Sequence, residues 1–366
     1  MKIDFMNLSR QYNEHKEEFL DAIENVCEST AFSGGKFSEQ FEKEWAEYVG
    51  VKYCVGVGSG TDAIFLVTKA LGICEGDEVI VPADTFIASA WGAAYCNATP
   101  VFVDCDKDTW EIDVDAIETA ITSNTKAIMA VHLYGQPCNL TKIVELAQKY
   151  GVCVIEDCAQ AHGAKWNGRK VGTFGKAGCF SFYPGKNLGA FGEAGAITTN
   201  DRELYEKVLA LRNHGAYERY YHDMIGYNMR LDGIQGAILS KKLMYLDGWN
   251  ARRNEIAARY RDGIKNPRIK MQAIDDNAYS VFHLFEVEVD EKKQFLDYMA
   301  QNEISCGQHY PVPCHLQKAF GYLGYKEGDI PVAEEHAKKC ISLPMFPELK
   351  DEEIDRVISV CNNWKV

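Results

Sequence analysis

A single lysine, Lys186, lies in the part of this chain that is best suited to covalent chemistry. The segment FSFYPGKNLGAFGEAG runs from Phe180 to Gly195 and predicts an apolar strand followed by a tight Pro/Gly turn that carries the lysine. An amine presented in this way can act as a nucleophile toward a carbonyl group. Taken alone, such a lysine is more often a solvated turn residue.

Two other segments carry groups that would complement this amine. VCVIEDCAQAHG (Val152 to Gly163) contains an apolar run closed by Asp157, which predicts a carboxylate at the carboxyl edge of a parallel sheet. GVGSGTDA (Gly56 to Ala63) is a glycine turn followed by the helical pattern AIFLVTKAL. The free N–H groups at the start of that helix, at Gly60 and Thr61, predict an anion site. By itself, the aspartate could be a helix cap and the turn a plain connector.

An amine, a carboxylate and an anion site together suit pyridoxal phosphate. This cofactor needs an amine with which its aldehyde forms an imine, a carboxylate that keeps its ring nitrogen protonated, and donors for its phosphate. Lys186, Asp157 and the pair Gly60 and Thr61 offer these three functions. The combination therefore predicts a pyridoxal phosphate site.

Length and composition indicate a large core and exclude several classes of protein. With 366 residues, of which 46% are hydrophobic, the chain is long enough for two or three domain-sized units. Its 13 cysteines show no CxxC pair, so we expect free thiols in a reducing cytoplasm and no metal site. The start, MKIDFMNLSRQY, lacks a signal-peptide core, and no window has the roughly 18 to 20 apolar residues of a membrane span. A net charge of −14 argues against a nucleic-acid partner.

Apolar runs alternate with amphipathic segments between Tyr53 and Asn200. The expected strands are YCVGVGSG, DEVIVPADTF, TPVFVDCD, KAIMAVHLYG, VCVIEDCAQ, GCFSFYPG and GAITTND. Strands separated by helices pair mainly in parallel and are covered by helices on both faces, which predicts an α/β fold. Because ligands bind at the carboxyl ends of such strands, the polar residues that follow them should line one cleft.

The pattern becomes helical after Asn200 and changes again near Trp249. Beyond that point come the strand-like FHLFEVEV, the helical KKQFLDYMAQNE, the segment HYPVPCHLQ and a terminal helix, DEEIDRVISVCNNW. We predict a large domain of residues 1–248, with an N-terminal helical segment, and a small C-terminal α+β domain of residues 249–366. No long flexible linker separates them, so they should share a cleft.

Seven motifs in sequence order resemble the DegT-type family of sugar-nucleotide aminotransferases. They are GSGTDA, PADTFIAS, HLYGQPC, IEDCAQAHGA, SFYPGKNLGAFGEAG, LRNHG and GYNMRLDGIQGA. The resemblance extends from about Asn7 through HYPVPCHLQ. It implies the fold-type-I architecture of pyridoxal phosphate enzymes, in which a mainly parallel sheet sandwiched by helices is joined to a smaller α+β domain. It also implies a homodimer with shared active sites.

The resemblance further implies roles for individual residues. Lys186 would form the imine with the cofactor, Asp157 would face the ring nitrogen and Gln160 the ring hydroxyl. Phe86 matches the aromatic residue that stacks on the pyridine ring, although on its own it would pass for a core residue. The phosphate would be bound by Gly60, Thr61 and Ser181 and, from the neighbouring subunit, by Asn228.

Amino transfer in this family would use Lys186 twice. An incoming amino acid, typically L-glutamate, displaces the lysine, and the freed amine then moves a proton between substrate and cofactor carbons. The acceptor is a nucleotide-linked keto-sugar. Members with histidine in place of this lysine catalyse dehydration, so Lys186 favours amino transfer, and His132 and His162 are expected to be structural or to line the pocket.

The acceptor implied by the motifs is a 3-keto-sugar. HLYGQ and SFYPGKNLGA are similar to the branch that aminates carbon 3 of dTDP-3-oxo-6-deoxyhexoses, giving a dTDP-3-amino-3,6-dideoxyhexose for glycan biosynthesis. GEAG in place of GDGG departs from that branch, so carbon 4 and a UDP-linked sugar are alternatives. Candidate substrate contacts lie near the lysine or in the ERYYHD loop: Tyr183, His309, Tyr310, His315, Tyr220, Tyr221 and His222.

Two other classes of protein share parts of this pattern. A Rossmann oxidoreductase also alternates strands and helices, but no GxGxxG motif with a following acidic residue opens the first βα unit here. A non-catalytic regulator or scaffold with the fold of these enzymes would not need Lys186, Asp157 and the phosphate turn, and all three are present.

Overall fold

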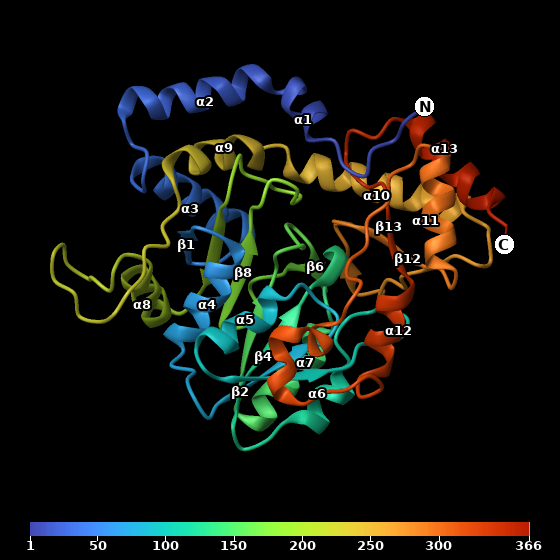
Figure 1. Cartoon of the computed structure of the whole chain (residues 1–366). Coiled ribbons are helices and arrows are strands. Elements are labelled where there is room, and N and C mark those ends of the chain that lie inside the picture. The colour runs from blue at the N-terminus through green and yellow to red at the C-terminus, as the bar shows by residue number, and fades with distance from the viewer. Residues whose placement is uncertain (366) are drawn as a thin grey trace.

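A seven-stranded sheet forms the centre of the molecule (Figure 1). The structure is a computed structural model and describes residues 1–365. The strand order is β1-β9-β8-β5-β4-β2-β3; β9 is antiparallel to both neighbours and the other pairs are parallel. The mainly parallel α/β sheet predicted from the sequence is thus confirmed. Its strands are β1 (Tyr53–Val57), β2 (Glu78–Pro82), β3 (Thr99–Val103), β4 (Thr125–Val131), β5 (Cys153–Asp157), β8 (Ala177–Ser181) and β9 (Gly195–Thr199).

Helices cover both faces of this sheet, as its nearly continuous apolar strands require. Alternate strand residues face opposite sides, so Val79 and Met129 join one core while Ile80 and Ile128 join the other. The first core is completed by α4 (Gly60–Ala70), α5 (Ala88–Tyr95) and α8 (Arg202–Arg212). The second is completed by α3 (Lys36–Val49), α6 (Val114–Ala120), α7 (Leu140–Tyr150) and α9 (Gly233–Leu243).

A separate apolar core surrounds a small antiparallel sheet at the right of Figure 1. The sheet and the helices packed on it are β10 (Lys270–Met271), β12 (Phe285–Glu288), β13 (Cys340–Leu343), α10 (Leu246–Gly263), α11 (Lys292–Gln301) and α13 (Asp351–Asn363). The domain boundary predicted after residue 248 falls inside α10. The two regions also exchange segments, because Ile3 packs in the core around the small sheet whereas Cys314 and Phe320 pack against the large sheet.

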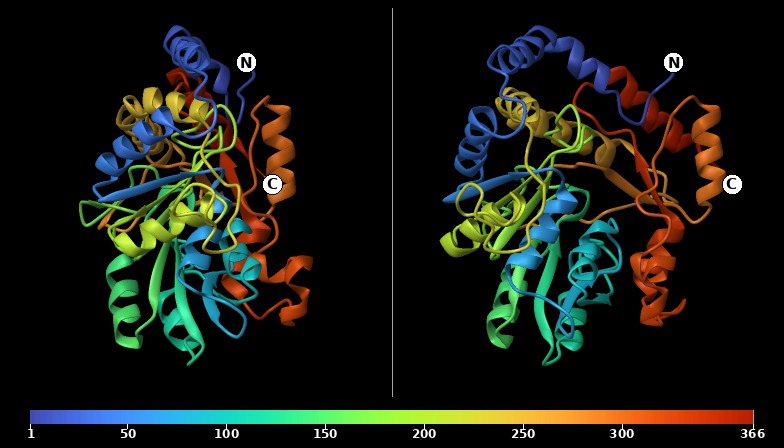
Figure 2. Two further views of the ribbon diagram at one scale, coloured as in Figure 1. Left: turned by 90° about the vertical axis from the view of Figure 1, so that its left-hand side faces the viewer. Right: turned by 60° about the vertical axis from the view of Figure 1, so that its left-hand side comes forward.

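The N-terminal helices form an arm along the outside of the molecule (Figures 1 and 2). The N-terminal helical segment expected from the sequence consists of α1 (Leu8–Glu14) and α2 (Lys16–Ser29), and α2 packs on α9 through Phe19 and Val26. The remaining short elements are η1 (Leu133–Gly135), β6 (Lys165–Trp166), β7 (Arg169–Lys170), β11 (Ala278–Tyr279), η2 (Cys314–Leu316), η3 (Lys318–Leu323) and α12 (Pro331–Lys339).

The cysteines are reduced, as expected from their spacing. All 13 cysteines are free thiols, most of them buried within the cores. Among residues 1–365, no helix combines the length and the apolar character needed to cross a membrane.

Candidate active site

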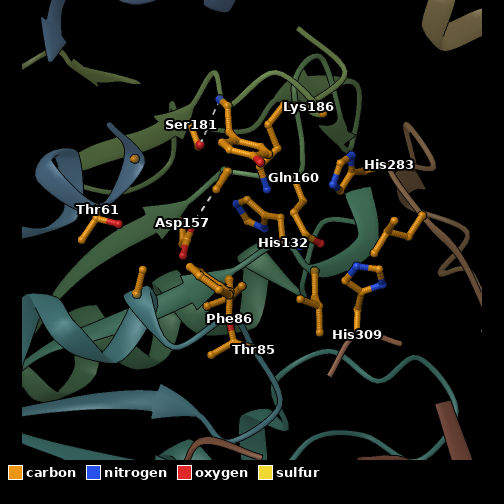
Figure 3. Close-up of a pocket in the computed structure, with 18 of the residues that line it drawn as sticks. Thr61, Thr85, Phe86, His132, Asp157, Gln160, Ser181, Lys186, His283 and His309 are labelled. Atoms are coloured by element: carbon orange, nitrogen blue, oxygen red, sulfur yellow. Dashed lines mark hydrogen bonds between the residues drawn. The ribbon is translucent and has the colours of Figure 1, made fainter. Parts of the chain in front are cut away.

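A cavity of about 580 Å³ lies at the carboxyl ends of the parallel strands (Figure 3). Its lining comes from the turns after β1, β2, β4, β5 and β8, which is the edge where the sequence predicted a cleft. In Figure 3, Thr61 lies on one side of the cavity and His283 and His309 lie on the other, with Asp157 and Lys186 between them. Segments far apart in the sequence therefore meet around one lysine.

Lys186 is held on a rigid loop between β8 and β9. Its backbone N–H donates to the carbonyl of Tyr183 at 2.8 Å, which closes the Pro/Gly turn predicted from the sequence. The next residue, Asn187, is buried and its amide donates to Asn250 Oδ1 at 2.9 Å. Burial of the amine lowers the pKa of Lys186 to about 8, a shift that the negative charge of Asp157 partly opposes. The amine can therefore lose and regain a proton near neutral pH.

Asp157 is the last residue of β5 and its carboxylate is buried at the floor of the cavity. Ser89 Oγ donates to Oδ2 at 2.7 Å and the backbone N–H of Ala159 donates to Oδ1 at 3.0 Å. Thr85 Oγ1 lies 2.8 Å from Ser89 Oγ and extends the network. These bonds fix the orientation of the carboxylate, which is the requirement for a partner of a protonated ring nitrogen.

The start of α4 forms a cradle for an anion. Ser59 caps the helix by accepting the N–H of Asp62 at 3.1 Å, while the N–H groups of Gly60 and Thr61 have no acceptor within the helix. Ser181, at the end of β8, is so close that a Cβ added to Gly60 would lie 2.6 Å from the Ser181 Cβ. Glycine is thus required for the two segments to meet, and together they offer the donors that a phosphate group needs.

Gln160 and Phe86 also line the cavity. Gln160 Oε1 accepts the N–H of Tyr134 at 2.6 Å, and its amide donates to the Tyr310 hydroxyl at 3.1 Å. Phe86 lines the cavity with half of its surface, 50%, exposed. The alternative that Phe86 is a core residue is therefore wrong. Of the predicted substrate contacts, Tyr183, His309 and Tyr310 line the same cavity.

Five predicted site residues do not line this cavity. His315 is buried on η2, where its Nε2 lies 3.1 Å from Glu334 Oε1, so its prediction as a substrate contact is wrong for this cavity. The other four are exposed on the loop that extends beyond α8 at the left of Figure 1: Tyr220, Tyr221, His222 and Asn228.

Several residues of the cavity were not predicted from the sequence. Phe5 and Met6 line it because Ile3 pairs with Ile304, and the Phe5 ring is stacked on that of His309 with centroids 5.7 Å apart. His283 also lines it, and its Nδ1 lies 3.1 Å from Asn187 Oδ1. No local pattern marks these residues, because they reach the cavity through pairing of distant segments.

Of the two histidines expected to be structural or to line the pocket, His162 is buried and His132 lines the cavity. His162 is buried with its Nε2 2.8 Å from the carbonyl of Ser181, and burial lowers the pKa of His162 to about 3. His132 lines the cavity and lies 3.3 Å from Glu156. Glu156 accepts the backbone N–H groups of Gly172, Phe174 and Gly175, so this pair has a structural role.

Residues 13–362 match the DegT/DnrJ/EryC1/StrS aminotransferase family. The chain belongs to this family. A relative from Aneurinibacillus thermoaerophilus, named dTDP-3-amino-3,6-dideoxy-alpha-D-galactopyranose transaminase, is 47% identical over 362 residues, which cover 99% of each chain.

Solved structures of this family superpose on the whole chain. DesV of S. venezuelae, in complex with a ketimine intermediate, is 40% identical with a TM-score of 0.97, covering 99% of this chain and 98% of that chain. NtdA from Bacillus subtilis, with the bound cofactor PMP, is 30% identical with a TM-score of 0.90, covering 98% and 84%. The chain is therefore an aminotransferase with the fold-type-I architecture, and its cofactor is pyridoxal phosphate. The fixed Asp157, the amine of Lys186 and the cradle at Gly60 fit that cofactor.

Proposed function

We propose that this aminotransferase transfers an amino group from L-glutamate to a nucleotide-linked keto-sugar. The proposed acceptor is a dTDP-3-oxo-6-deoxyhexose and the product a dTDP-3-amino-3,6-dideoxyhexose. The observation that carries the proposal is the amine of Lys186, with a pKa of about 8, beside a fixed carboxylate and an anion cradle in one cavity. The 47% identity to a transaminase of this sugar class over the full length supports the acceptor.

The residues of the cavity have complementary roles in this proposal. Pyridoxal phosphate, when bound, withdraws electrons from the carbon that loses a proton. Lys186 would hold the cofactor and, once its amine is free, would move a proton between the substrate carbon and the cofactor carbon, which a pKa near the working pH favours. Asp157 keeps the ring nitrogen protonated, and Ser89 keeps Asp157 in place. The N–H groups of Gly60 and Thr61 hold the phosphate.

Residues on the far side of the cavity are proposed to bind the sugar. Tyr183 is 54% exposed at the cavity, Tyr310 also lines it, and His309 lies on the side opposite the phosphate cradle (Figure 3). The exposed loop with Tyr220, Tyr221, His222 and Asn228 is proposed to reach the cavity of a second copy in a homodimer. This proposal is supported by the exposure of two tyrosines on the loop, which lies outside this chain's own cavity. Tyr220 is 78% exposed and Tyr221 is 66% exposed.

One experiment tests the reaction and its substrates. Purified holoenzyme would be mixed with L-glutamate, and the absorbance would be followed for conversion of the pyridoxal to the pyridoxamine form. The pyridoxamine form would then be given dTDP- and UDP-linked 3-keto and 4-keto sugars, with the aminated carbon located by NMR. Lys186→Ala is the control and should be inactive.

The outcomes separate the alternatives. Amination of carbon 3 of a dTDP-sugar would support the proposal, whereas amination of carbon 4 or of a UDP-sugar would replace the proposed acceptor. No spectral change with any amino acid would favour a non-catalytic regulator instead.

The shared site has its own test. Asn228→Ala and Lys186→Ala would be co-expressed with different tags, and the mixed dimer would be purified. If Asn228 acts across the interface, this dimer has one complete site and regains about half of the wild-type activity. Activity as low as in the two parent variants would contradict the proposed sharing.

A further inference from the structure

A buried hydrogen-bonded chain reaches His309 from behind the cavity wall. His309 Nδ1 lies 2.7 Å from Ser342 Oγ, and Ser342 Oγ is in turn hydrogen-bonded to Glu286 Oε2. Ser342 and Glu286 lie opposite each other on the paired strands β13 and β12, and both are buried. The other ring nitrogen, Nε2, has no partner within residues 1–365, and His309 lines the cavity. This hydrogen-bonded chain therefore decides whether Nε2 presents a donor or an acceptor to a substrate.

The surroundings of Glu286 favour a neutral carboxylic acid. Its side chain is 2% exposed, and within the described residues Oε1 has no hydrogen-bond partner. The cation that acts on it, Lys292, donates instead to the Ala337 carbonyl at 3.0 Å. An ionised carboxylate with one donor and no cation would be costly in this place. Burial accordingly raises the pKa of Glu286 well above its usual range.

The charged groups around Glu286 reinforce this state. Asp84 and Glu288 add negative charge, which favours the neutral acid further. Glu288 already has a cationic partner in Lys270 at 3.3 Å and a hydrogen bond from His336 at 2.8 Å. Of the two glutamates, Glu286 is thus the better placed to keep a proton.

A neutral Glu286 sets the direction of every bond in the chain. An ionised Glu286 would accept the Ser342 hydroxyl proton at Oε2. With a proton on Oε2, the acid O–H donates to Ser342 Oγ instead, so the single hydroxyl proton of Ser342 is left to donate to Nδ1 of His309. Burial and the nearby Lys186 lower the pKa of His309 to about 4, so the ring is neutral and carries one proton. With Nδ1 as acceptor, that proton is on Nε2.

We propose that Ser342 and Glu286 are positioning residues that hold His309 as the Nε2–H tautomer, so that Nε2–H donates a hydrogen bond to an oxygen of the keto-sugar. The role toward the sugar rests on the proposed function. Phe5 stacks on the ring of His309, with an angle of 24° between the planes, and fixes its plane. A fixed donor near the amine of Lys186 would orient the keto-sugar for the reaction.

The tautomer can be measured without any substrate. In protein labelled with ¹⁵N-histidine, the chemical shifts of His309, assigned with His309→Asn, should show a protonated Nε2 and a bare Nδ1. Glu286→Gln should keep this tautomer, because the amide N–H can donate to Ser342 in place of the acid. Glu286→Leu and Ser342→Ala should lose it. A protonated Nδ1 in the wild-type protein would overturn the proposal.

Kinetics test the role toward the sugar. Ser342→Ala should lower kcat/KM for the keto-sugar about 10-fold to 100-fold, with less than about 3-fold change in the reaction with glutamate. Glu286→Gln should lower kcat/KM for the keto-sugar far less than Glu286→Leu does. Tyr260→Phe is the matched control, because it removes a buried hydrogen bond to Pro344 in the same region without contacting His309.

The results distinguish this inference from the proposed function. The positioning role would be refuted if Ser342→Ala lowered kcat/KM equally for the keto-sugar and for glutamate. It would also be refuted if Glu286→Gln and Glu286→Leu lowered kcat/KM for the keto-sugar equally. Failure of the wild-type enzyme to aminate any keto-sugar would refute the proposed function, and with it the role toward the sugar. The ¹⁵N shifts of the same protein would still decide the tautomer.

Discussion

Replacing Gly60 by alanine is the sharpest test of the phosphate cradle. The added Cβ would lie 2.6 Å from Ser181 Cβ and 3.1 Å from Ser181 Cα, whereas ordinary contacts begin at 3.4 Å. The start of α4 and the end of β8 must therefore separate by about 0.8 Å, the difference between 3.4 and 2.6 Å. Neither can rotate away, because Ser181 is in the sheet and Gly60 begins a helix packed on it.

This displacement has two expected consequences. Overpacking of this size costs about 1–3 kcal/mol of unfolding free energy, which the better helix propensity of alanine offsets by at most about 1 kcal/mol. The N–H groups of Gly60 and Thr61 also move relative to Ser181. Loss of one hydrogen bond to a charged phosphate is worth about 1.5–3 kcal/mol, which corresponds to roughly 10-fold to 100-fold weaker binding of pyridoxal phosphate.

The assay is a titration of cofactor-free protein with pyridoxal phosphate and, separately, with pyridoxal. Gly60→Ala should weaken the binding of pyridoxal phosphate far more than the binding of pyridoxal, because only pyridoxal phosphate carries the phosphate group. Gly248→Ala is the matched control, since Gly248 is exposed in α10 and nothing lies within 4 Å of its added Cβ. Equal binding of pyridoxal phosphate by wild-type and Gly60→Ala protein would refute the cradle.

Three further predictions concern other groups. Because only the neutral amine attacks an aldehyde and the pKa of Lys186 is about 8, capture of pyridoxal phosphate should slow about tenfold per pH unit below that pKa; a rate independent of pH in stopped-flow absorbance would contradict it. Asp157→Asn should still bind the cofactor but lose about 100-fold or more in kcat. If this variant turned over as fast as the wild-type enzyme, Asp157 could not be the group that keeps the ring nitrogen protonated. Glu156→Gln should cost about 2–4 kcal/mol in urea unfolding, because its amide would face the N–H donors of Gly172, Phe174 and Gly175. The surface substitution Glu118→Gln is the control and should leave the unfolding transition nearly unchanged.

The sequence by itself determined the sheet and the residues at its carboxyl edge. Apolar strands alternating with helices can form only a mainly parallel sheet covered on both faces, and parallel strands bring their ends to one edge. Asp157 and Ser181 close strands, and Gly60 and Lys186 lie in the turns that follow, so their meeting follows from local order along the chain. For the same reason, their chemistry could be inferred before the cavity was seen.

Only the tertiary structure decided which distant segments complete the cavity. Phe5 enters it because Ile3 pairs with Ile304, and His283 directly follows Phe282, which packs in the core around the small sheet. His315, equally polar in sequence, is instead turned toward Glu334. The hydrogen-bond chain to His309 likewise depends on pairing of β12 with β13. Burial and hydrogen-bond direction are properties of contacts between elements, so no local pattern specifies them, and they decide which polar side chains serve the reaction and which serve the fold.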